Sequence, residues 1–128
     1  MVRSAAQPHV LVIGLDPHRV PGPWDPQPVA EGIESATARF AEHGIDVQNC
    51  LVGLDGSDDV EAVVAAALTA STWDCVLVGG GIRKAEERLE LFEAIINLVH
   101  RHAPAATIAF NQTLDDVVDA VERRLGLP

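Results

Sequence analysis

An aspartate and a histidine that could transfer protons stand two positions apart near the start of the chain. Asp16 and His18 follow closely on a short apolar run, HVLVIG, over residues 9–14. A carboxylate and an imidazole within hydrogen-bonding reach can serve as a general acid and base. The same pair is also typical of a turn, in which Asp16 binds the backbone before Pro17 and His18 is solvated. Asp16 and His18 are therefore catalytic candidates, and the structural interpretation stays open beside the chemical one.

A second group of residues could bind an anion. Gly79, Gly80 and Gly81 follow another apolar run, CVLV, and Arg83 and Lys84 come two and three residues after the last glycine. Consecutive glycines let the backbone turn sharply and present N–H groups to an anion. The pattern is neither a G-x-G-x-x-G fingerprint nor a P-loop, because no Gly-Lys-Ser/Thr follows. A tight turn without a ligand is the alternative interpretation.

Positive charge is scarce in this chain, and part of it falls beside these glycines. There are 9 Lys+Arg against 19 Asp+Glu, a formal net charge of −10. A planar guanidinium binds carboxylate or phosphate in a bidentate manner, so Arg83 is expected to contribute more than Lys84. The predicted anion site consists of Gly79, Gly80, Gly81, Arg83, Lys84, Arg19 and Asn111.

The elements that must position these residues are short apolar runs alternating with stretches of helical periodicity. This alternation predicts a parallel sheet with right-handed crossovers and helices on both faces. Ser57 is expected to cap the second helix and Thr113 the last one, with Asp116 completing a capping box. The predicted strands cover 9–14, 45–52, 75–78 and 106–110, and the third helix covers 86–102.

The polarity of the strands predicts their order. The first and third runs are apolar throughout, as in strands buried on both faces, whereas the second alternates and is typical of an edge strand. The sequence therefore predicts a three-layer α/β/α sandwich, flavodoxin-like, with a four-stranded parallel sheet of order 2-1-3-4. Ligands of such sheets bind beyond the carboxyl ends of the strands at the switch point, here between the first and third strands. Cys50 and Cys75 would then be separated by the first strand and remain unpaired.

The connection over residues 15–28 is long for a strand-to-helix loop and contains five prolines and Trp24. Loops of this length are usually functional or disordered. Prolines lower the entropy that a loop loses on ordering. Two interpretations stay open: a lid that places Trp24 over a ligand, or a loop in which Trp24 packs on its own domain.

Composition excludes several classes of protein. The length of 128 residues suits one domain, expected over 9–128 after a disordered tail at 1–8. The acidic balance argues against nucleic acid and anionic membranes as partners. No apolar run could span a bilayer, and the N-terminus is not a signal peptide, which predicts a cytoplasmic protein. The spacing of Cys and His predicts no metal site, and no cofactor is expected.

Over its whole length the chain resembles a group of small bacterial proteins of flavodoxin-like pattern. The resemblance rests on the glycine-rich turn with Arg83, the stretch over 91–97 and the pair Phe110-Asn111. The group has no assigned activity, so the resemblance implies the fold alone. The chain is also rich in Ala and contains more Arg than Lys, which is likewise typical of a bacterial protein.

A partial resemblance connects the chain to cobalamin-binding domains. Residues 14–18, Gly-Leu-Asp-Pro-His, and residues 40–47 are similar to that family's Asp-x-His-x-x-Gly region and the stretch after it. The resemblance implies cobalamin binding with His18 as the lower axial cobalt ligand. Gly22 falls one residue late for this motif, and the triple glycine replaces the family's Ser-x-Leu.

Taken from the residues themselves, the leading expectation is binding of a small anionic molecule in the crevice between the first and third strands. Acid/base chemistry by Asp16 and His18 would make the protein an enzyme. The alternative is a non-catalytic partner-binding or assembly module. A small sheet with two open edges suits a homodimer.

Overall fold

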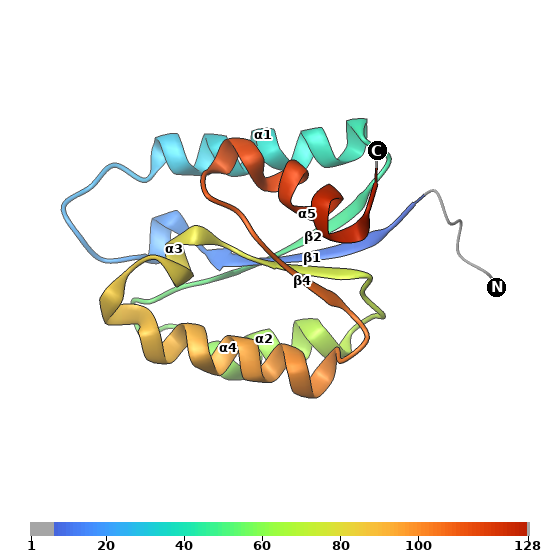
Figure 1. Ribbon diagram of the computed structural model, residues 1–128. Coiled ribbons are helices and arrows are strands. Elements are labelled where there is room, and N and C mark those ends of the chain that lie inside the picture. Colours follow the sequence, from blue (N-terminus) through green and yellow to red (C-terminus); the bar gives the residue numbers. More distant parts are fainter. Residues whose placement is uncertain (1–6, 128) are drawn as a thin grey trace.

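A four-stranded parallel sheet forms the centre of the computed structural model, which describes residues 7–127 (Figure 1). Its strands are β1 (His9–Leu15), β2 (Asp46–Val52), β3 (Cys75–Val78) and β4 (Thr107–Phe110). They lie in the order β2-β1-β3-β4, and every neighbouring pair is parallel. The predicted strand order and fold class are confirmed.

Helices cover both faces of the sheet, as the crossovers require. In Figure 1, α1 (Gln27–Glu42) and α5 (Val117–Leu125) lie on one face, and α2 (Val60–Thr69) and α4 (Leu89–His102) lie on the other. The short helix α3 (Gly80–Arg83) follows β3 directly. Short 3-10 turns cover Pro17–Arg19, Glu86–Arg88 and Leu114–Asp116.

The alternation of side chains along the strands divides the core into two clusters. Leu11 and Ile13 of β1 join the cluster under α2 and α4, whereas Val10 belongs to the cluster under α1 and α5. All four residues of β3 are buried, which agrees with its central position. Only Cys50 and Val52 of β2 are buried, as expected for an edge strand.

The ends of the helices correct one prediction and confirm another. Asp59, and not Ser57, caps α2, because its carboxylate accepts the Ala62 N–H at 3.2 Å. Ser57 instead donates its N–H and hydroxyl to Asp55, in the turn before the helix. Thr113 and Asp116 form the predicted capping box, which surrounds a 3-10 turn that leads into α5.

The third predicted helix is divided in the structure. The residues over 86–88 form a 3-10 turn, and the regular helix α4 begins at Leu89. The glycines at 79–81 are also not an open loop, since Gly80 and Gly81 already belong to α3.

Both cysteines are free, as predicted, and they lie on opposite faces of the sheet. Cys50 packs under α2 and Cys75 under α1 and α5. Burial raises the pKa of each thiol, which keeps it protonated and unreactive at neutral pH.

Most of the expected tail over 1–8 lies outside the described residues; Pro8, which is described, accepts the Asp46 N–H with its carbonyl oxygen. Within residues 7–127, no helix has both the length and the apolar character needed to cross a bilayer.

Candidate functional site

A cavity lies where the sequence predicts a site, at the carboxyl ends of β1 and β3. It has a volume of about 630 Å³ and opens between α1, the sheet and the start of α5. Pockets that hold small molecules fall in this size range. Its deeper wall is apolar and consists of Val12, Ile33, Ala36, Phe40, Leu51, Leu77 and Val117.

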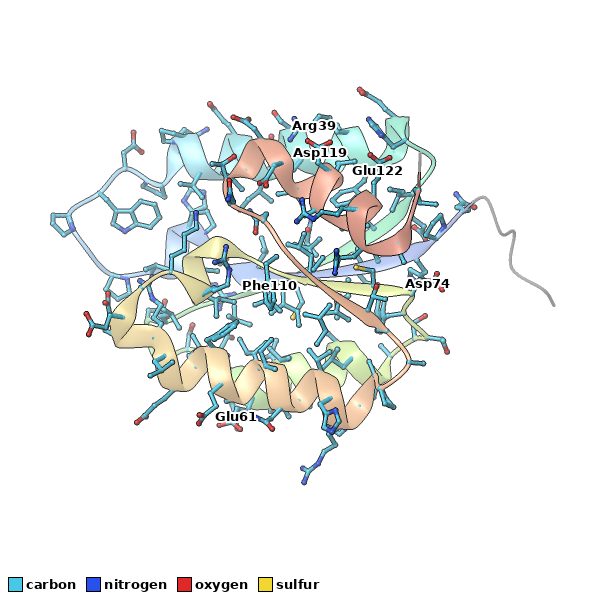
Figure 2. The ribbon with its side chains drawn as sticks, viewed as in Figure 1. Arg39, Glu61, Asp74, Phe110, Asp119 and Glu122 are labelled. Carbon is cyan, nitrogen blue, oxygen red and sulfur yellow. The ribbon has the colours of Figure 1, made fainter. Side chains whose placement is uncertain are left out.

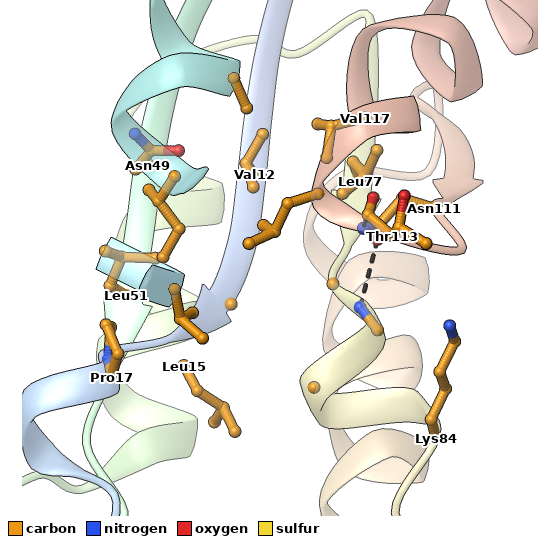
Figure 3. A pocket seen from close by; sticks show the side chains of 18 of the residues that line it. Val12, Leu15, Pro17, Asn49, Leu51, Leu77, Lys84, Asn111, Thr113 and Val117 are labelled. Atoms are coloured by element: carbon orange, nitrogen blue, oxygen red, sulfur yellow. Dashed lines mark hydrogen bonds between the residues drawn. The ribbon is translucent and has the colours of Figure 1, made fainter. Parts of the chain in front are cut away.

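Cationic and polar groups line this cavity near the glycine turn, and Thr37 and Asn49 add two polar side chains elsewhere on its wall. Lys84 and Arg88 both line it, as do Asn111 and Thr113. Figure 3 shows Lys84, Asn111 and Thr113 on one side of the space, with Asn49 and Leu51 of β2 on the opposite side. An apolar interior with a few polar groups at one end is the usual composition of a small-molecule site.

Asn111 joins the two loops that border this polar end. Its side chain is 5% exposed, the one polar residue among the fully buried ones of the described chain. Its Oδ1 accepts the Gly80 N–H at 3.1 Å, the bond drawn in Figure 3, and its Nδ2 donates to the Thr113 carbonyl oxygen at 2.7 Å. Asn111 therefore fixes the start of α3 against the turn that precedes α5.

The two cations after the glycines take different positions. The Lys84 ammonium donates to the Gln112 carbonyl oxygen, and its side chain lines the cavity. The Arg83 guanidinium donates to the Asn111 carbonyl oxygen and lies 5.5 Å from the centroid of the Phe110 ring. Arg83 is not among the residues that line the cavity, and its Nε is buried without a hydrogen-bond acceptor in the described chain.

Arg19 is bound to two carboxylates of its own domain. Its Nε donates to Asp16 at 2.9 Å, and its Nη1 donates to Asp58 at 2.8 Å. Asp58 also accepts the Gly53 N–H, so this network ties the loop after β1 to the loop after β2. Both carboxylates raise the pKa of Arg19. Arg19 therefore neutralises acidic groups of the protein itself.

The structure places Asp16 in a capping role beside His18. The Asp16 carboxylate accepts the backbone N–H of His18 at 3.0 Å, at the start of a 3-10 turn, and the His18 side chain is exposed. The hydrogen bond from Arg19 lowers the pKa of Asp16. A carboxylate with a lowered pKa is ionised at neutral pH and is a weak base, so these contacts match the turn that the sequence also allowed.

The Asp16–Arg19 pair predicts a pH dependence of stability. Because the folded-state pKa of Asp16 lies below its usual value of 3.8, the pair stabilises the fold above that pH. The stabilisation is lost as the pH falls through the lowered pKa. The difference in thermal midpoint between the wild type and Asp16→Asn should therefore be largest near neutral pH and shrink toward pH ~2. A constant difference across that range would show that the charge of Asp16 contributes nothing.

Trp24 belongs both to its own loop and to the cavity wall. Its indole N–H donates to the Val20 carbonyl oxygen at 3.2 Å, and the side chain is 40% exposed. The same residue lines the cavity. The loop over 15–28 thus contributes an aromatic wall to the site while Trp24 is anchored locally.

Several lining residues were not among the sequence candidates. Arg88 follows the glycines by several residues and was assigned to a helix, yet it lines the cavity and donates to the Gly81 carbonyl oxygen at 2.9 Å. Ile33 and Phe40 line the cavity from α1, and neither was named as a candidate from the sequence. The signal that could have identified them is their position on the helix that covers the predicted crevice.

A smaller groove lies on the other side of the sheet, at the β4 edge. It measures about 380 Å³ and includes Leu89, Phe92, Ile96 and Phe110. In Figure 2, Phe110 lies between the sheet and the layer of α4. The exposed fractions of Leu89 and Phe110 are 65% and 36%. The open edge strand and this groove are where a protein partner would find apolar surface.

Comparisons with the models of known protein families and with curated proteins find no match to this chain. In residues 7–127, no group of three or more His, Cys, Asp or Glu side chains is arranged to hold a metal ion. The functional inference therefore depends on the geometry of the cavity.

Proposed function

We propose that this protein binds a small organic anion in the cavity at the carboxyl ends of β1 and β3. One observation carries the proposal: an apolar cavity of about 630 Å³ has Lys84 and Arg88 at its polar end. The position agrees with the general location of ligands in parallel α/β sheets. The proposal concerns binding, because the carboxylate of Asp16 is engaged by Arg19 and by the backbone of His18.

Charge supports an anion as the ligand. The chain has only 9 basic residues and a net charge of −10, so cations in a cavity are unexpected by chance. Arg19 is neutralised by two carboxylates, whereas Lys84 and Arg88 donate to backbone carbonyl oxygens and form no ion pair with a carboxylate of residues 7–127. An acidic group at the mouth of the cavity would supply the missing countercharge.

The experiment is a thermal-shift and calorimetric screen with carboxylates and organic phosphates. Saturable stabilisation by an anion is expected for the wild type. Lys84→Ala should weaken that binding about tenfold, the effect of losing one charge-assisted contact. The unliganded thermal midpoint should change little, because the Lys84 side chain is exposed.

Two further variants make the result specific. Arg101→Ala removes the same charge from an exposed position at the end of α4 and should leave anion binding unchanged. Arg83→Ala separates the cavity from the site expected from the sequence. If Arg83→Ala abolishes the response and Lys84→Ala does not, the anion binds outside the cavity and the proposal is wrong.

A further inference from the structure

Two glycines occupy positions where the sheet should direct side chains toward α1. Along β1, Val12 faces the α1 side, and the next residue with that orientation is Gly14. Along β3, Leu77 faces the same side and is followed by Gly79. Both glycines line the cavity. The cavity therefore opens where Gly14 of β1 and Gly79, the residue directly after β3, both lack a side chain.

The backbone conformation requires neither glycine. Gly79 has φ −66° and ψ 152°, values that any L-residue adopts. Gly14 pairs with Leu51 in a register that runs without interruption along β1 and β2, so there is no bulge at this point. The glycines of the described chain that do have positive φ are Gly22, Gly44, Gly56 and Gly126.

Packing within the chain does not require these glycines either. A Cβ atom at Gly14 would lie 3.5 Å from Leu51 Cδ2, and one at Gly79 would lie 3.4 Å from the Ile13 carbonyl oxygen, both ordinary contacts. By contrast, a Cβ atom at Gly32 would lie only 2.5 Å from Leu114 Cδ1, so the Leu114 side chain would have to move to admit it.

Glycine inside a strand weakens it, and where no bulge or bend explains it, a ligand often approaches the backbone there. We propose that the absence of side chains at Gly14 and Gly79 leaves room for a hydrocarbon group of the ligand. We call this part of the cavity the hydrocarbon seat. The ligand is then an amphipathic organic acid. Its hydrocarbon part lies over the two glycines, and its acidic group reaches Lys84. This inference rests on the proposed function and specifies its ligand class.

The walls around the seat match this chemistry. Val12 and Leu77 precede the two glycines by two residues along the chain, Ile33 and Phe40 line the cavity from α1, and all four side chains are apolar. Asn49 lies at the far side of the cavity, where its Nδ2 already donates to Thr37 Oγ1 at 3.0 Å. Among the described residues, the cations that line the cavity are Lys84 and Arg88, both in the segment after the glycine turn, so a molecule with one acidic end and an apolar body fits in one direction.

The test is a calorimetric titration with the sodium salts of butanoate, hexanoate and octanoate. If the hydrocarbon part is buried, affinity should rise about fourfold for each added methylene group. In Gly14→Val, the new side chain fills the seat, and this dependence on chain length should disappear. Gly14→Ala should reduce it, and this smaller change keeps the test valid if the valine variant does not fold.

The unliganded variants provide the structural control. A β-branched residue suits a strand better than glycine does, so Gly14→Val should keep or raise the thermal midpoint while it weakens octanoate binding. A loss of affinity together with a large loss of stability in both variants would indicate that Gly14 is a packing residue, and the inference would be wrong.

The outcomes separate this inference from the proposed function. If the short anions bind through Lys84 but chain length has no effect, the hydrocarbon seat is refuted and anion binding stands. If 1-octanol binds as tightly as octanoate and Lys84→Ala binds both normally, the anion site is refuted and the seat stands. If none of these compounds binds to the wild type, the hydrocarbon seat is refuted, and the screen with carboxylates and organic phosphates decides the anion site separately.

Discussion

Replacing Phe40 with alanine is expected to lower the free energy of unfolding by about 3–5 kcal/mol, the usual range for a buried phenylalanine. The ring is 1% exposed and packs in the cluster under α1 and α5. Its removal enlarges a space that borders the existing cavity, so collapse of the surroundings would recover little of the loss. Urea unfolding should show a lower midpoint with an unchanged slope.

Leu89→Ala is the control for Phe40→Ala. The Leu89 side chain is 65% exposed, so the same type of truncation should change stability by no more than about 0.5 kcal/mol. A loss below about 1 kcal/mol for Phe40→Ala would contradict the packing of α1 against the sheet.

Asn111→Ala is expected to cost about 1–3 kcal/mol of stability, because it removes a buried amide and leaves two partly buried backbone groups without partners. The Gly80 N–H loses its acceptor, and the Thr113 carbonyl oxygen loses its donor. The start of α3 and the turn before α5 then lose the side chain that joins them. Differential scanning calorimetry of the two proteins measures the effect.

The neighbouring residue offers a close control for Asn111→Ala. Gln112 is exposed, and its recorded hydrogen bonds use its backbone N–H and carbonyl oxygen. Gln112→Ala preserves these groups and should be nearly neutral. Equal effects of the two substitutions would show that the Asn111 amide does not hold the loops together.

The strand order was predictable because a strand that is buried on both faces consists of apolar residues throughout. Val76 and Leu77 continue an apolar run that only a central strand tolerates, whereas the exposed Gln48 and Asn49 belong to an edge. The location of the crevice follows from that order and from the general behaviour of parallel sheets. Capping by Thr113 was equally local, since it depends on residues three positions apart.

The partners of charged side chains were not predictable in the same way. Arg19 was expected to be available to an anion, but Asp58, 39 residues later, neutralises it across the loop after β2. No residue close to Arg19 in the sequence indicates its contact with Asp58. The different directions of Arg83 and Lys84 are also set by tertiary structure. The residues that they contact are Phe110, Asn111 and Gln112, which lie at the end of β4 and directly after it.

The cavity lies on one face of the sheet. Residues that form the core under α2 and α4 are therefore largely distinct from the residues that line the cavity. Under α2 and α4, the core includes fully buried residues such as Val64, Ile95 and Val99, and none of these three lines the cavity. The face under α1 contributes to the core and also contains the cavity proposed to bind the ligand. Selection or design for a new ligand can therefore vary Ile33, the loop over 15–28 and the glycine positions, while the opposite half retains the stability that absorbs such changes.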